Sequence, residues 1–126
     1  MSKSILMTSS ILLAAAVAIG AFGAHGLKSH FSAEMMQIYK TGVEYHFYHA
    51  LGLMLIGVVA ISFPSKLLKW SAVFLAAGIL LFSGSLYVLS ITGIKWLGAV
   101  TPAGGISFIV GWVLLLVVVL KDFTVK

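Results

Sequence analysis

Ionisable and aromatic side chains gather in one short stretch of the chain, TGVEYHFYHALG, from Thr41 to Gly52. It holds Glu44, Tyr45, His46 and His49, whose side chains can bind a ligand, hold an ion or carry a proton. In a helix, residues three or four positions apart share a face, so Tyr45 and His49 lie together with His46 beside them. The stretch therefore predicts a functional site near the end of an apolar helix.

A second polar stripe occurs later in the chain, where Ser83, Tyr87 and Ser90 follow i, i+4, i+7 spacing. If this helix runs opposite to the first, a rise of about 1.5 Å per residue puts Ser83 and His49 at similar depth. We expect His49 to hydrogen-bond across helices to Ser83 and Tyr87, because an unpaired polar group is costly in hydrocarbon. The predicted polar pocket, our candidate ligand-binding site in the outer half of the bundle, consists of His25, Glu44, Tyr45, His49, Ser83 and Tyr87.

Two other interpretations account for the same residues. In the structural one, Glu44 pairs with Lys40 one turn earlier and the aromatic side chains form a belt at the membrane interface. In the other, His46 and His49 with Glu44 and His25 hold a metal ion, or His25 and His49 hold a haem. The sequence HFYH lacks the HExxH arrangement, no Ser-His pairing is indicated, and the chain has no cysteine. We therefore expect no metal, no cofactor and no enzymatic activity.

The elements that position these side chains must cross a membrane. Of 126 residues, 61% are hydrophobic and 9% are charged, and the apolar residues form runs too long for a soluble core of this size. The runs are continuous rather than alternating, which predicts helices. We expect an all-α fold, an integral membrane four-helix bundle with short loops and a short interfacial helix between the first two spans. Residues 1–126 form one transmembrane domain, with spans at about 5–24, 41–62, 70–91 and 102–120.

The lysines indicate how the bundle is oriented. Four spans put both termini on one side, and that side holds more lysines than the other, so the positive-inside rule predicts cytoplasmic termini in the cell (inner or plasma) membrane. The terminal side carries Lys3, Lys66, Lys69, Lys121 and Lys126, against Lys28, Lys40 and Lys95 opposite. The net charge of +5 includes no arginine and is spread over both sides, which suits lipid headgroups and not nucleic acid.

Small residues repeat every four positions in the first and fourth spans. This spacing lets helix backbones approach closely, within the bundle, between copies of the chain or against another membrane protein. The helix-packing residues predicted in this way are Gly20, Ala103, Ser107 and Gly111.

Four segments carry a resemblance to a known family: GAFGAHGLK, YHFYHALGL, LFSGSLYVLSITG, and TPAGG with the GW that follows it. They resemble the small bacterial membrane proteins of domain-of-unknown-function family 423 over nearly the whole chain. The resemblance implies a four-helix inner-membrane protein of unassigned biochemical activity. It supplies no catalytic residues, although its motifs include His25, Tyr45, His49, Ser83, Gly84 and Tyr87.

The leading functional hypothesis is a non-catalytic multi-pass membrane protein that supports membrane or envelope integrity, or a partner membrane protein. The alternative is a small oligomeric transporter or channel that uses Glu44 and His49 as protonatable groups. A transport path needs polar residues through the inner half of the bundle. The second and third helices offer almost none from Gly52 to Ser62 or from Trp70 to Leu80, which favours a closed pocket.

Overall fold

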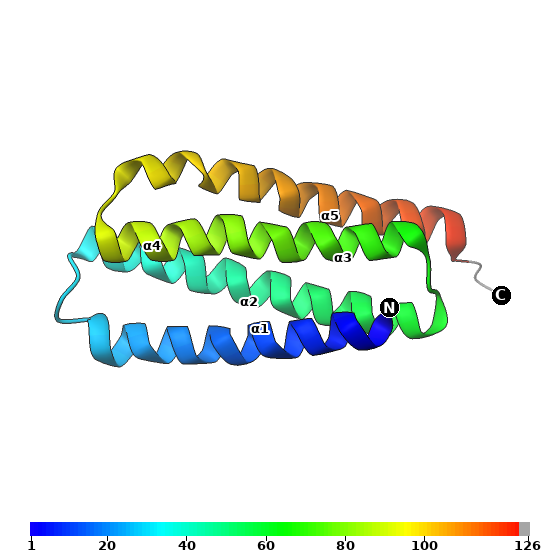
Figure 1. Cartoon of the computed structure of the whole chain (residues 1–126), viewed down its shortest axis with the longest axis horizontal. Coiled ribbons are helices and arrows are strands. Elements are labelled where there is room, and N and C mark those ends of the chain that lie inside the picture. Colours follow the sequence, from blue (N-terminus) through cyan, green and yellow to red (C-terminus); the bar gives the residue numbers. More distant parts are fainter. Residues whose placement is uncertain (124–126) are drawn as a thin grey trace.

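Four long apolar helices make up the computed structural model, which describes residues 1–123 (Figure 1). They run over Ser2–Leu27, Ala33–Ser62, Lys66–Thr92 and Lys95–Asp122. Each is long enough to cross a hydrocarbon core about 30 Å thick. Their outward side chains are large and apolar, with Ile11 67%, Leu80 70% and Leu120 74% exposed. Such surfaces favour lipid over water, so the predicted all-α, four-helix membrane fold is confirmed.

Two of these helices contain a π-helical turn, and the last begins with a short 3-10 segment. In a π turn the backbone hydrogen bonds reach one residue further than in an α-helix, and such turns often occur at functional sites. In chain order the elements are α1 (Ser2–Phe22), η1 (Gly23–Leu27), α2 (Ala33–Ser62), α3 (Lys66–Gly78), η2 (Ile79–Ser83), α4 (Gly84–Thr92), η3 (Lys95–Ala99) and α5 (Thr101–Asp122).

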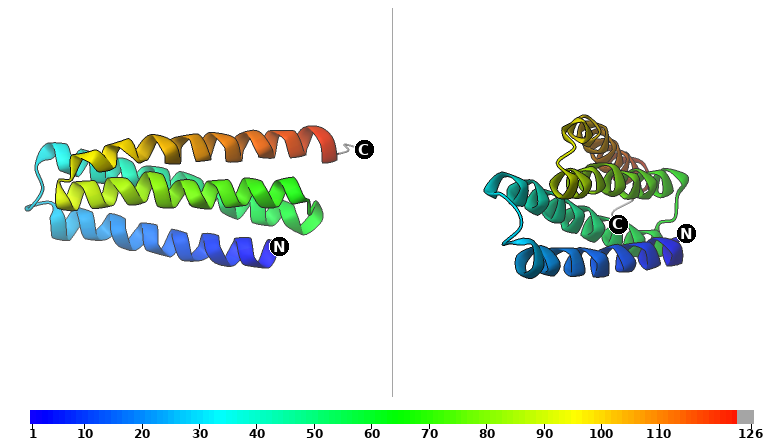
Figure 2. Two further views of the ribbon diagram at one scale, coloured as in Figure 1. Left: turned by 45° about the horizontal axis from the view of Figure 1, so that its top comes forward. Right: turned by 60° about the vertical axis from the view of Figure 1, so that its left-hand side comes forward.

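The helices are arranged so that α1 and α5 lie on opposite sides of the molecule, with α2 and the continuous α3–α4 helix between them (Figures 1 and 2). The most extensive contacts join α1 to α2 and α3 to α5. The N-terminus, the loop between α2 and α3, and the end of α5 share one end of the bundle (Figure 1). We call this the terminal end, and the other the loop end.

The second helix begins earlier than predicted. Ser32 caps it, because its side chain accepts a hydrogen bond from the backbone N–H of Met35 at 3.1 Å. From Ala33 the helix continues without a break through Gly42, so the separate interfacial helix that we expected is instead the first turns of α2. Continuity keeps each backbone hydrogen bond within the segment, as lipid requires.

The start of α5 lies close to the predicted one, at about residue 102. Thr101 before Pro102 is typical of an N-cap, but Val100 is the N-cap residue. Thr101 is the first helical residue, and its hydroxyl lies 2.7 Å from the hydroxyl of Ser85 in α4. Pro102 falls in the first turn, where its missing N–H leaves no gap in the helical hydrogen bonds. At the end of α4, Gly93 has a φ of 72°, a left-handed conformation that glycine adopts without strain.

Of the three predicted packing residues of α5, Ser107 and Gly111 lie inside the bundle and Ala103 does not. Ala103 is exposed, whereas Gly104 is buried against the backbone of Phe82. Ser107 and Gly111 are buried on the same face as Gly104. A helix turns about 100° per residue, so two steps of four residues from Ala103 drift about 80° around the axis, whereas the seven residues from Gly104 to Gly111 return within about 20°. Within the bundle, the buried face of α5 therefore follows i, i+3, i+7 spacing, counted from Gly104.

In α1, Gly20 is partly buried next to α2, and a Cβ there would lie 3.3 Å from the Val43 side chain. The aliphatic core continues from this helix pair toward the terminal end. Its largest fully buried apolar side chains are Leu53, Ile56, Leu68, Leu75 and Val118.

Candidate functional site

The six residues of the predicted polar pocket separate into two groups. His25 in η1 and Glu44 in α2 are exposed, and Tyr45 is 37% exposed. His49 and Ser83 are buried, and Tyr87 is partly buried. The buried members already have partners in neighbouring helices or in their own helix, so the six residues do not line one shared pocket.

The central polar contact between α2 and α4 joins His46 to Tyr87. The Nδ1 atom of His46 lies 2.8 Å from the hydroxyl oxygen of Tyr87. A hydroxyl can donate or accept, so this bond forms with either tautomer of the imidazole. Gly42 makes room for it, since a Cβ there would lie only 2.9 Å from the Tyr87 ring. The sequence predicted His49 as the histidine that bonds to Tyr87, and this prediction is wrong.

The other side of the His46 ring faces the interior. Its Nε2 atom is buried and has no hydrogen-bond partner within residues 1–123. The backbone of Leu12 in α1 lies near the ring. His46 is therefore placed among three helices: it belongs to α2, bonds to α4 and lies next to α1. The sequence analysis did not predict that His46 is buried. The signal was Gly42, one turn earlier on the same face, because α4 packs against it.

His49 lies inside the bundle as predicted, but it faces α5. Its ring stacks on Phe108, with centroids 3.5 Å apart and planes 10° apart. Its Nδ1 atom donates to the backbone carbonyl oxygen of Tyr45 at 2.8 Å, which leaves Nε2 as the unprotonated nitrogen of the neutral ring. Because the side chain of residue 49 points about 60° away from that of residue 46, the two histidines serve different interfaces.

Aromatic rings extend this contact across the middle of the bundle. The ring centroids of Tyr45 and Phe82 are 4.5 Å apart, and those of Phe82 and Phe108 are 5.5 Å apart. Phe82 and Ser83 belong to the π turn η2, which places them between α2 and α5. The aromatic group of Tyr45, His49, Phe82 and Phe108 thus fills the level at which a polar pocket was predicted.

Buried hydroxyls connect the helices to each other. Ser83 donates to the carbonyl oxygen of Gly42 at 2.7 Å, which ties η2 to α2. Between α3 and α5 the bonds are reciprocal. Ser71 donates to the carbonyl oxygen of Gly111 at 2.6 Å, and Ser107 donates to that of Phe74 at 2.7 Å. Each proton is held by a backbone carbonyl of the next helix, an arrangement that joins neighbouring helices.

The metal and haem alternatives need His25 close to His46 or His49. Instead His25 is exposed in η1, His46 bonds to Tyr87, and His49 is enclosed against Phe108. Within the described chain, no three His, Asp or Glu side chains come together as ligands of one ion.

Comparison with known proteins identifies relatives over most of the chain. The family described as "Protein of unknown function (DUF423)" matches residues 19–105. The "UPF0382 membrane protein YwdK" of Bacillus subtilis is 44% identical over 94% of this chain and 98% of its own. The "UPF0382 inner membrane protein YgdD" of Escherichia coli K12 is 46% identical over 80% of this chain and 77% of its own.

No solved structure matches the chain. The family match covers more than half of the sequence, and both relatives are named as membrane proteins, as the four apolar helices require. The chain therefore belongs to the DUF423 family of membrane proteins of unknown function.

Proposed function

We propose that this protein is a non-catalytic component of the cell membrane that supports a partner membrane protein, and through it the integrity of the envelope. The observation that supports this proposal is that the buried polar side chains hydrogen-bond to neighbouring helices. The hydroxyls of Ser71, Ser83 and Ser107 donate to carbonyls of neighbouring helices, and His46 bonds to Tyr87. These groups hold the bundle together, and the serine protons are held by backbone carbonyls and not by a general base.

The same geometry argues against transport by Glu44 and His49. Glu44 is exposed on α2, whereas His49 is buried between α2 and Phe108 of α5. Toward the terminal end the interior is filled by aliphatic side chains, among them Leu53 and Leu75. The buried hydroxyls on that side, Ser9 and Ser71, already donate to backbone carbonyls, so within residues 1–123 they offer no continuous polar path onward from His49.

A partner helix has an accessible surface on α1. This helix packs chiefly against α2, and much of its other surface is exposed. Ser10, Ala14 and Ala18 are exposed there at i, i+4, i+8 spacing, between the larger side chains of Ile11 and Val17. In lipid, helices associate through small residues that let backbones approach closely, so this surface suits one transmembrane helix of a partner.

The proposal includes cytoplasmic termini. At the terminal end the described lysines are Lys3, Lys66, Lys69 and Lys121, against Lys28, Lys40 and Lys95 at the loop end. An excess of lysine marks the cytoplasmic side of short loops. The name of the Escherichia coli relative, an inner membrane protein, supports placement in the cell membrane.

Site-specific photo-crosslinking in living cells tests the partner surface. A photoreactive residue at Ala14 should give one adduct of defined mass, and Ala18→Leu should abolish it by wedging the helices apart. The matched position is Val113 on α5, which is 50% exposed and should give no discrete adduct. Equal labelling from both positions would refute the assignment of this surface. A proton flux in protein-containing liposomes that Glu44→Gln removes would favour the transporter instead.

A further inference from the structure

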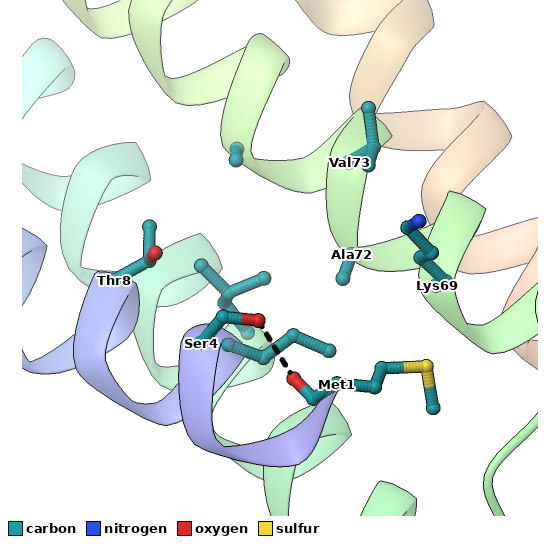
Figure 3. Close-up of a pocket in the computed structure, with 9 residues that line it drawn as sticks. Met1, Ser4, Thr8, Lys69, Ala72 and Val73 are labelled. Atoms are coloured by element: carbon teal, nitrogen blue, oxygen red, sulfur yellow. Dashed lines mark hydrogen bonds between the residues drawn. The ribbon is translucent and has the colours of Figure 1, made fainter.

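An open groove separates α1 from α3 at the terminal end (Figure 3). Its volume is about 380 Å³. Each helix contributes residues at i, i+3, i+4 and i+7, and α2 contributes Leu53, which is 1% exposed. The lining residues are Met1, Ser4, Ile5, Thr8, Leu53, Lys69, Ala72, Val73 and Ala76.

This spacing is the pattern by which one helix normally packs on another. Here the two faces do not meet, because α1 packs on α2 and α3 packs on α5. On the α3 side, Ala72 and Ala76 are too small to fill the space between them. A groove of this volume would hold about a dozen water molecules at roughly 30 Å³ each, yet its wall is mostly carbon. In a bilayer, its natural filling is a hydrocarbon chain.

The charged residue of the groove, Lys69, lies at its terminal end. Lys69 is the fourth residue of α3 and therefore lies about 5 Å from the start of that helix, whereas Ala76 lies about 10 Å further into the membrane. On the facing helix, Ser4 lies near the terminal end, and its hydroxyl donates to the carbonyl oxygen of Met1 at 2.9 Å, whereas Thr8 lies one turn further in, away from Lys69 (Figure 3). From the terminal end inward, the groove thus presents a cation first and mostly apolar side chains after it, which is the order of headgroup and tail in an anionic phospholipid.

The charge of this end selects among lipids. Besides Lys69, it carries Lys3 and Lys66 near the starts of α1 and α3. The last turn of α5 adds Lys121 and Asp122. Within residues 1–123, Asp122 is the only acidic residue at the terminal end, so lysines outnumber acidic residues there. Basic pockets between transmembrane helices bind anionic headgroups, since each lysine near the membrane surface attracts them.

We propose that the groove between α1 and α3 is a binding site for one anionic glycerophospholipid. Its phosphate binds at Lys69, and one acyl chain lies along Leu53, Ala72 and Ala76. The lipid would then fill the interface that α1 and α3 leave open. This site is separate from the outward face of α1 proposed for a partner helix.

Native mass spectrometry of the full chain, released from neutral detergent and titrated with phosphatidylglycerol or phosphatidylethanolamine, tests the site. We expect one tightly bound phosphatidylglycerol per chain and weaker binding of phosphatidylethanolamine. Lys69→Gln should weaken phosphatidylglycerol binding about fivefold. The matched control is Lys66→Gln, which removes a lysine one turn earlier that does not line the groove. It should change binding less than about twofold, as expected for a solvent-screened charge.

A second pair of variants tests the tail. Val73→Trp should block the groove from its rim, since Val73 is 43% exposed, whereas Val113→Trp on α5 should leave lipid binding unchanged. Circular dichroism identifies any variant that does not fold. Equal losses for both lysine variants, equal binding of the two lipids, or full binding by Val73→Trp would each overturn the proposal. A lipid-free dimer that Val73→Trp dissociates would also overturn it, by showing that a second copy fills the groove.

Discussion

The ring of Tyr87 in α4 lies over Gly42 of α2, and its hydroxyl reaches Nδ1 of His46 at 2.8 Å. The ring fits there because glycine has no Cβ, and the hydroxyl finds a partner because His46 lies one turn deeper on the same face. Ser83, one turn before Tyr87, donates back to the carbonyl of Gly42. These contacts set the register between the two helices. They require a glycine at position 42 and a hydrogen-bonding side chain at position 46.

Gly42→Ala should destabilise the protein by about 1–3 kcal/mol, because the new methyl group would lie 2.9 Å from the Tyr87 ring and force it to move. Gly84→Ala is the control, since no atom lies within 4 Å of a Cβ at that position. It should be neutral or stabilise the helix by roughly 0.5–1 kcal/mol. Thermal unfolding in detergent measures both, and equal losses would mean that the two helices do not meet at Gly42.

His46→Phe should cost more stability than His49→Phe. The first removes the partner of the Tyr87 hydroxyl and leaves it unpaired, at about 1–3 kcal/mol. The second keeps a flat ring stacked on Phe108 and removes only a bond to a carbonyl of its own helix. A cycle with Tyr87→Phe checks the pairing, and its coupling energy should be about 0.6–1.7 kcal/mol. Zero coupling would contradict the His46–Tyr87 contact.

Two adjacent glycines of α5 should respond differently to alanine. A Cβ on Gly104 would collide with the backbone of Phe82, which cannot move aside as a side chain can. A Cβ on Gly105 would lie 3.9 Å from the Phe82 ring, an ordinary contact. We expect Gly104→Ala to lose about 1–3 kcal/mol and Gly105→Ala to be tolerated. Unfolding of the purified variants distinguishes them, and the reverse order would place the helix contact on another face of α5.

A reporter that is active only in the cytoplasm should work when it is fused after Lys126, which lies outside the described residues, and should fail when it is inserted near Ser29. The expectation rests on the lysine excess at the terminal end. A reporter active only outside the cytoplasm provides the complementary measurement. The opposite pattern in both assays would invert the proposed orientation.

Much of the fold follows from the sequence alone. Long apolar runs with few charges predict helices that cross a bilayer, because lipid leaves backbone groups no partner outside their own segment. Local chemistry also accounts for one helix start, at Ser32 with its bond to Met35, since capping depends only on neighbours in the chain. The number and direction of the helices, and the placement of the lysines at their ends, need no tertiary information.

The rotation of each helix about its axis was decided only by the tertiary structure. In a soluble bundle the apolar stripe shows which face turns inward, but here lipid-facing and buried faces are both apolar, so this signal is lost. For that reason the sequence predicted His49 instead of His46 as the partner of Tyr87, and it did not identify Gly104 as a packing residue. A change of one residue turns a side chain by about 100°, and only close packing against the neighbouring helix determines which one points inward.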